Sequence, residues 1–151
     1  MFYTFFINNK YDFEKNKIFL LDSTANFRGL KIIENGVNVL EIICDLFQVT
    51  ISNNSKLIKF ASEDYEVSLS YLLWFEVYYS KDGSSEKGMM QVIDDFIKIP
   101  NSQAILFSNG DKPILLKRSE KIIVDQHRLG TVDFPFEEMS VDYESGIINQ
   151  I

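Results

Sequence analysis

Residues able to carry out nucleophilic catalysis are few in this chain. Cys44 is the single cysteine and His127 the single histidine, so any Cys–His or Ser–His pair would depend on His127. Cys44 lies among apolar residues, where a free cysteine most often packs as a small hydrophobe, and we expect His127 at an exposed strand end. One cysteine and one histidine also cannot form the usual four-ligand structural zinc site. The sequence therefore predicts neither a catalytic pair nor a zinc centre.

Two pairs of adjacent carboxylates, Asp94-Asp95 and Glu137-Glu138, could serve acid–base chemistry or bind a hard cation. Neighbouring side chains on a helix point about 100° apart, however, so the two carboxylates of a pair do not converge on one atom. We expect Asp94 to pair instead with Lys98, four residues later, on a solvated helix face. The glycines form neither a G-x-G-x-x-G nor a Walker A motif, and we expect no cofactor and no enzyme activity.

The acidic charge of the chain is concentrated near its end. The formal net charge is −7, and residues 129–151 contribute five acidic side chains but no lysine or arginine. Aromatic side chains interleaved with these acids could anchor a contact with a partner. We call residues 129–151 the C-terminal segment. Its candidate partner-binding residues are Asp133, Phe134, Phe136, Glu137, Glu138, Asp142, Tyr143 and Glu144.

Other readings of the acidic residues stay open. Phe134-Pro135-Phe136 could pack the end of the chain onto the core, with residues 145–151 frayed. The binding surface could equally lie around Glu41 and Asp45, or around Asp94 and Asp95, because a charge count does not select among solvated faces.

An alternation of apolar residues predicts a long strand from Val67 to Tyr79. Leu72 and Trp74 add apolar groups to its second face, so we expect a central strand that is partly covered on both sides. A hairpin turn is expected at Asn109-Gly110. Shorter strands are predicted at residues 2–7, 17–21, 56–61, 103–108, 113–118 and 121–125.

Two helices are predicted between the strands. The first would span about residues 37–48, with a hairpin at Asn35-Gly36 as the alternative. The helix prediction rests on a single polar stripe formed by Asn38, Glu41, Asp45 and Gln48. The second would follow Asp82-Gly83, which ends the long strand, with Ser84 or Ser85 as its N-terminal cap, and would end before Pro100. Its inward positions would be Met89, Met90, Ile93, Phe96 and Ile97.

The order of these elements predicts the fold class. Consecutive strands joined by short polar turns favour antiparallel pairing, and the helices come singly rather than after each strand. A chain of 151 residues with 46% hydrophobic residues can bury a core of its own. We therefore expect one α+β domain over residues 1–151, with a mainly antiparallel sheet and about two packed helices.

Composition also restricts the location and the partners of the protein. No apolar stretch approaches the roughly 20 residues of a membrane helix, and no basic region precedes the apolar N-terminus as in a signal peptide. The single cysteine fits a reducing compartment, so we expect a cytoplasmic protein without membrane contact. A pI of about 4.7 opposes direct binding to nucleic acid and suits a basic protein partner.

The small size, the acidity, the Ile/Asn/Lys/Phe-rich composition and the lack of a catalytic motif together resemble one class of proteins. These are the small acidic immunity proteins of bacterial contact-dependent and other polymorphic toxin systems. The resemblance implies a non-catalytic protein that binds a cognate toxin domain and blocks its active site or substrate surface. Charge complementarity favours a basic nuclease, with a ribonuclease acting on tRNA as one candidate. A non-catalytic adaptor or subunit of a bacterial complex and a small carboxylate-dependent hydrolase are the alternatives.

Overall fold

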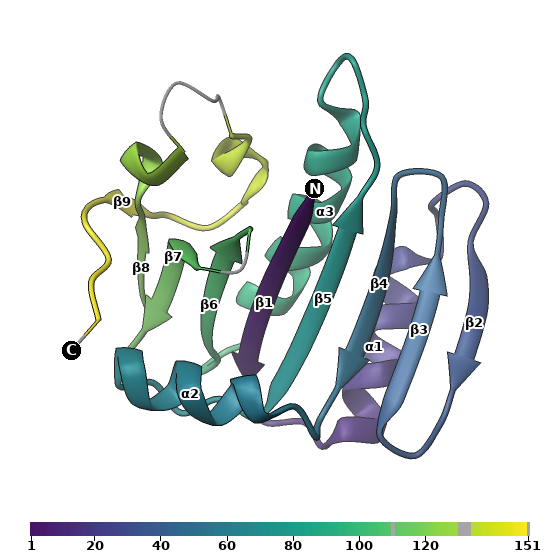
Figure 1. Ribbon diagram of the computed structural model, residues 1–151, viewed down its shortest axis with the longest axis horizontal. Helices are drawn as coiled ribbons and strands as arrows, with labels where there is room; N and C mark the ends of the chain where they lie inside the picture. The colour runs from purple at the N-terminus through teal and green to yellow at the C-terminus, as the bar shows by residue number, and fades with distance from the viewer. Residues whose placement is uncertain (110, 130–133, 151) are drawn as a thin grey trace.

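The computed structural model describes residues 1–109, 111–129 and 134–150, and one sheet of nine strands runs through it (Figure 1). The strand order is β2-β3-β4-β5-β1-β6-β7-β8-β9. Neighbouring strands are antiparallel except β8 and β9, which are parallel. With three α-helices in the described residues, the chain is an α+β domain, as expected, with one helix more than predicted.

The bounds of the elements follow the order of the chain. The strands are β1 (Phe2–Asn8), β2 (Lys31–Asn35), β3 (Val39–Ile43), β4 (Phe47–Ser52), β5 (Tyr71–Val77), β6 (Gln103–Ser108), β7 (Lys112–Arg118), β8 (Lys121–Val124) and β9 (Glu144–Ser145). The helices are α1 (Phe13–Thr24), α2 (Lys56–Tyr65) and α3 (Ser84–Ile97), with short 3-10 helices η1 (Gln126–Leu129) and η2 (Phe136–Glu138). Within the described ranges, no helix has the length and apolar character that crossing a bilayer requires.

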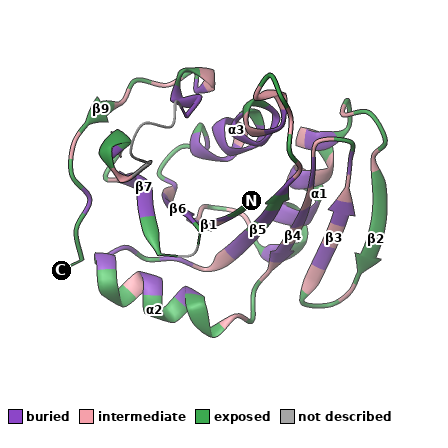
Figure 2. Ribbon diagram, turned by 45° about the horizontal axis from the view of Figure 1, so that its top comes forward, coloured by how far each residue is buried: buried purple, intermediate pink, exposed green. Residues whose placement is uncertain are grey.

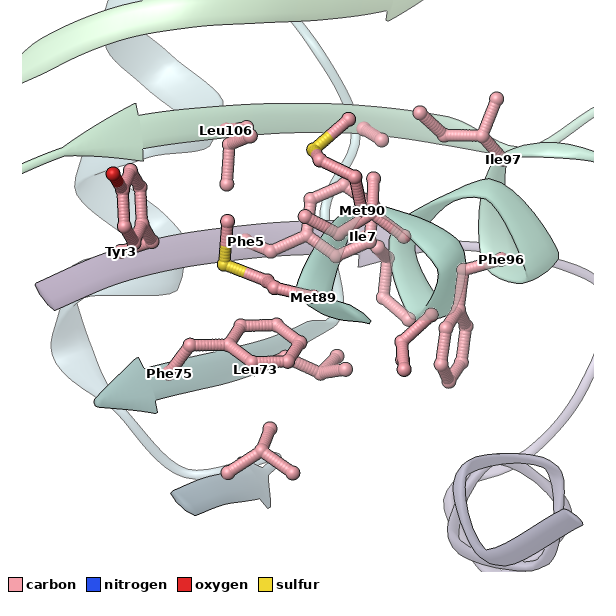
Figure 3. Close-up of a cluster of buried hydrophobic side chains, with 14 of the residues drawn as sticks. Tyr3, Phe5, Ile7, Leu73, Phe75, Met89, Met90, Phe96, Ile97 and Leu106 are labelled. Carbon is pink, nitrogen blue, oxygen red and sulfur yellow. The ribbon is translucent and has the colours of Figure 1, made fainter. Parts of the chain in front are cut away.

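The helices lie on opposite faces of the sheet (Figures 1 and 2). α1 and α3 cover the face that we call the inner face, and α2 crosses the other, outer face. Successive residues of a strand point to opposite faces, so Phe5 and Ile7 of β1 join the inner core while Phe6 joins the cluster beneath α2. Figure 3 shows the inner core, where Met89, Met90 and other side chains of α3 pack on the central strands.

The long strand predicted from Val67 to Tyr79 is shorter in the structure, where β5 covers only Tyr71–Val77. Its predicted central position is confirmed, since β5 lies between β4 and β1. Its inward residues Leu73 and Phe75 are fully buried. On the outer face the prediction holds only in part. Leu72 is buried with the residues of α2, whereas Trp74 is outside that buried cluster and is 50% exposed.

The helix predicted after Asp82-Gly83 is confirmed as α3, which begins at Ser84 and ends at Ile97, before Pro100. Its cap differs from the serine predicted. Gly83 caps the helix with a left-handed φ of 74°, which glycine adopts without strain. The Asp82 carboxylate accepts a hydrogen bond from the backbone N–H of Ser84 at 3.1 Å, and this bond lowers the pKa of Asp82.

The helix predicted at residues 37–48 is wrong, and the alternative of a hairpin is right, although its turn lies later than Asn35-Gly36. This stretch contains β3 and the start of β4, and β2 pairs with β3. Asn35 is the last residue of β2 and pairs with Leu40, so residues 36–38 form the turn. Burial along β3 has a period of two, with Leu40 and Ile42 directed inward. β-branched residues are frequent in both strands, which favours a pleated, half-buried surface over a helix.

The strands predicted at residues 17–21 and 56–61 are also wrong, because both stretches belong to helices. Each helix begins at a side-chain cap: Asp12 accepts from the backbone N–H of Lys15, and Ser55 from that of Leu57. The apolar residues that α2 buries, Ile58, Ala61 and Tyr65, recur at helical spacing.

The strands predicted near the N-terminus and in the second half of the chain are confirmed as β1, β6, β7 and β8. β6 and β7 pair antiparallel, as a hairpin at Asn109-Gly110 would require. Asn109 has a positive φ of 52°, and Gly110 lies outside the described residues.

Candidate functional site

Cys44 and His127 are held far apart. Cys44 is buried at the end of β3, and His127 is exposed in η1, directly after β8. Five strands separate β3 from β8 in the sheet, and each inter-strand step is roughly 4.8 Å. The two side chains therefore do not form a catalytic couple. No cluster of three or more His, Cys, Asp or Glu side chains suited to a metal ion occurs among the described residues.

Asp94 and Asp95 form hydrogen bonds with two different segments of the fold. Asp94 forms the predicted ion pair with Lys98, at 3.4 Å, which raises the pKa of Lys98. The prediction that Asp94 lies on a solvated face is wrong. Asp94 is buried, and its carboxylate accepts hydrogen bonds from the backbone N–H and the hydroxyl of Ser140. Asp95 accepts a 2.6 Å hydrogen bond from the Ser23 hydroxyl of α1. Both carboxylates thus have structural partners.

The aromatic residues predicted to anchor a partner in the C-terminal segment lie mostly inside the core. Phe134 and Phe136 are buried, and Phe136 is only 1% exposed. Their ring centroids are 4.8 Å apart, and Phe134 also contacts Tyr3 of β1 at 5.6 Å. Tyr143 is partly buried against the same cluster. The alternative that Phe134-Pro135-Phe136 packs onto the core is confirmed, so these two rings are not exposed to a partner.

The acidic residues of the C-terminal segment lie on separate elements. Glu137 is exposed and Glu138 half-buried on η2, while Asp142 and Glu144 are exposed near the sheet edge. Glu144 of β9 pairs with Lys121 of β8 at 3.4 Å. Asp133 lies outside the described residues.

The end of the chain is attached rather than frayed over residues 145–150. Ile148 is 2% exposed, and its backbone N–H donates to the buried carboxylate of Asp125 at 3.1 Å. Arg128 joins the two, donating to Asp125 at 3.1 Å and to the carbonyl oxygen of Ile148 at 2.6 Å. Asp94 and Asp125 together attach the C-terminal segment to the domain, a structural role that was not predicted from the sequence.

A second surface combines acids with aromatic residues on the outer face of the sheet, beyond α2. It surrounds a shallow hollow of about 350 Å³ across strands β1 to β5. We call it the outer sheet surface. Its residues are Phe2, Glu34, Val39, Glu41, Gln48, Thr50, Trp74 and Glu76.

Large apolar side chains at this surface are open to solvent. Trp74 is 50% exposed and Phe2 is 45% exposed, and their ring centroids lie 5.6 Å apart. Leu57 and Phe60 of α2 are 52% and 55% exposed, and they line a neighbouring hollow with Thr4, the residue of β1 that pairs with Trp74. Clustered exposed apolar groups of this kind mark interaction surfaces more often than isolated ones do.

Three carboxylates border the exposed rings. Glu76 follows Trp74 on the same face of β5, and Glu41 accepts a hydrogen bond from Gln48 of β4. Glu34 of the edge strand β2 lies directly opposite Glu41. Like charges in this position destabilise a sheet. None of the three carboxylates forms an ion pair within the described part of the chain.

Glu41 was among the alternative binding positions in the sequence, but the rest of this surface was not predicted, for two reasons. Trp74 was expected to be covered, and Glu41 and Gln48 were assigned to a helix that does not exist. The alternation of Trp74 and Glu76 with buried residues was the signal available, because it places both side chains on one face of a strand.

Comparisons with models of protein families, with curated proteins and with solved structures found no match to this chain.

Proposed function

We propose that this protein binds and neutralises a basic protein through its outer sheet surface, as an immunity protein against a bacterial toxin domain. The observation that carries the proposal is the exposure of Trp74 and Phe2 beside carboxylates that form no ion pair with a described residue. Tryptophan in the desolvated centre of an interface is among the most frequent energetic hot spots. Bordering carboxylates attract a positively charged partner and accelerate association.

Charge complementarity supports a nuclease as the partner. A nuclease must present lysine and arginine to the phosphates of its substrate, and an acidic surface can compete for those side chains. Glu41 and Glu76 would contact the basic groups, while Trp74 would fill an apolar site between them. Such an inhibitor blocks the substrate surface and needs no catalytic group or cofactor. A ribonuclease that cleaves tRNA is one candidate, and the cytoplasm is the compartment in which the two would meet.

The C-terminal segment has a different part in this proposal. Its buried rings and its attachment through Asp94 and Asp125 support the fold beside α3 and β8. Its acids, the half-buried Glu138 and the exposed Glu137, Asp142 and Glu144, remain a second predicted contact surface. Neutralising each acidic set separately distinguishes the two surfaces.

Co-purification tests the proposed function. The tagged chain, expressed in its native host and isolated in mild salt, should retain a stoichiometric basic protein that mass spectrometry identifies. That protein should arrest growth when it is expressed without this chain, and co-expression of this chain should restore growth. A housekeeping complex in its place would support the adaptor alternative. The absence of any partner would contradict the proposal and return attention to a carboxylate-dependent hydrolase.

A further inference from the structure

The two edges of the sheet differ in length and in exposed apolar area. One edge is β9, which has only two residues, Glu144 and Ser145. The other is β2, whose five residues are all exposed and include Ile32 and Ile33 at 54% and 55% exposure. Figures 1 and 2 show no other described element beside the outer side of β2. An uncovered edge with apolar side chains is a template for a further strand.

We propose that two copies of this chain associate through β2, forming one continuous antiparallel sheet. In the register that fits best, Lys31 lies opposite Glu34 of the second copy, and Ile32 lies opposite Ile33 of the second copy. The arrangement has two-fold symmetry, so each of these pairs occurs twice. The edge strands would exchange backbone hydrogen bonds, the isoleucines would leave water, and two ion pairs would form.

The irregularity in β2 makes this register possible. Residues three apart in a regular strand point to opposite faces. In β2, however, Lys31 pairs with Ile43 and Glu34 pairs with Glu41, with a register shift between Ile32 and Glu34. Ile43 and Glu41 are two residues apart on β3 and share the outer face, so Lys31 and Glu34 share it too. Opposed side chains of an antiparallel pair must lie on one face, and the proposed ion pairs meet that condition.

Electrostatics identifies a second copy as the occupant of the edge. Glu34 has Glu41 on one side, across the β2–β3 pair, and an open edge on the other. Lys31 of the second copy would bring a positive charge to that open side and offset the repulsion. A strand chosen at random would not supply a cation opposite Glu34 and an anion opposite Lys31. This inference does not rest on the proposed function, because association is measured without any other protein.

Sedimentation equilibrium of the purified full chain, and of variants in which the charges at Lys31 and Glu34 are reversed, tests the proposal. We expect a concentration-dependent dimer between about 10 μM and about 1 mM, the range for a small interface. Lys31→Glu and Glu34→Lys should each weaken dimerisation about tenfold or more, because each turns two attractive pairs into repulsive ones. The double variant restores opposite charges in the reversed order, and its dimerisation constant should return to within about threefold of the original.

Lys56→Glu is the matched control, since it makes the same charge change at an exposed position on α2 and should leave dimerisation unchanged. A chain that stays monomeric over the whole concentration range would overturn the proposal. So would a dimer that both single variants leave intact, or a double variant that dimerises no better than either single one. Recovery in the double variant also shows that the losses were not due to unfolding.

Discussion

The C-terminal segment and the outer sheet surface both combine carboxylates with aromatic rings, and they place those rings oppositely. In the C-terminal segment Phe136 is 1% exposed and packs against Phe134 inside the core. On the outer sheet surface Trp74 is 50% exposed, and the helix that covers Leu72 does not extend over it. Two regions of similar composition can therefore differ in role, one holding the fold together and the other facing solvent.

The carboxylates attached to the C-terminal segment and those of the outer sheet surface also differ in burial. Asp94 and Asp125 are buried and accept hydrogen bonds from the segment that they attach. Glu41 and Glu76 have no ion pair with a described residue and border an open hollow. Buried acids with donors serve stability, whereas exposed acids beside an open aromatic ring are available to a partner.

Phe136→Ala should give the largest effect and test the structural role of the C-terminal segment. Removing a fully buried ring leaves a cavity in the core, so the free energy of unfolding should fall by about 3–5 kcal/mol. Urea denaturation followed by circular dichroism measures the change. Trp74→Ala, which removes an exposed ring, should change that free energy by only about 1 kcal/mol or less. Equal losses in the two variants would contradict the distinction between the regions.

Trp74→Ala should have the largest effect on binding. Loss of an interface tryptophan typically costs about 2 kcal/mol or more, which corresponds to a Kd roughly 30-fold higher for the co-purified partner. Isothermal titration calorimetry provides the measurement. Tyr79→Ala is the control, because Tyr79 is an aromatic residue 90% exposed and outside the outer sheet surface. An unchanged Kd for Trp74→Ala would mean that the partner binds elsewhere.

Neutralising the acids of each region separately should sharpen the comparison. Glu41→Gln combined with Glu76→Gln should slow association several-fold and reduce its dependence on salt, since exposed charges act mainly on the on-rate. The same change at Glu137 and Glu138 should have a smaller effect. Surface plasmon resonance at two or more ionic strengths measures both variants. A larger effect from the η2 pair would favour the C-terminal segment as the binding surface.

Glu34→Gln should produce the smallest effect, and in the stabilising direction. It removes the like charge opposite Glu41, so the isolated protein should gain about 0.2–1 kcal/mol in free energy of unfolding at low protein concentration. Chemical denaturation measures the gain. Glu144→Gln, which removes the partner of Lys121, should give no such gain. If Glu34→Gln is no more stable than the parent, the repulsion between the two carboxylates is not significant.

Local signals in the sequence were sufficient for part of the fold. The alternation around Leu73 and Phe75 predicted a strand, and Ser84-Ser85 indicated the start of α3. The stripe at residues 37–48 misled because Asn38 and Asp45 lie in turns while Glu41 and Gln48 lie on strands, so its helical spacing is a coincidence. Helices α1 and α2 follow Asp12 and Ser55, whose capping role is plain only once the helix is known.

The outer sheet surface depends on contacts between distant residues, which local sequence patterns do not contain. Phe2, Glu41 and Trp74 are distant in the sequence and come together only because β1, β5, β4 and β3 are neighbours in the sheet. The burial of Phe136 likewise depends on contacts with elements far from it in the chain. Charge and composition could identify acidic, aromatic regions, but the exposure of each ring required the tertiary structure.

Trp74 is the single tryptophan of the chain, so its environment can be followed without interference from other indoles of this protein. The most direct test labels it as 5-fluorotryptophan and records the fluorine NMR signal while the unlabelled co-purified partner is added. We expect the signal of Trp74 to shift on binding and to lose its sensitivity to a soluble paramagnetic agent, as the ring leaves water. A signal that stays unchanged and accessible at saturation would contradict the assignment of the outer sheet surface.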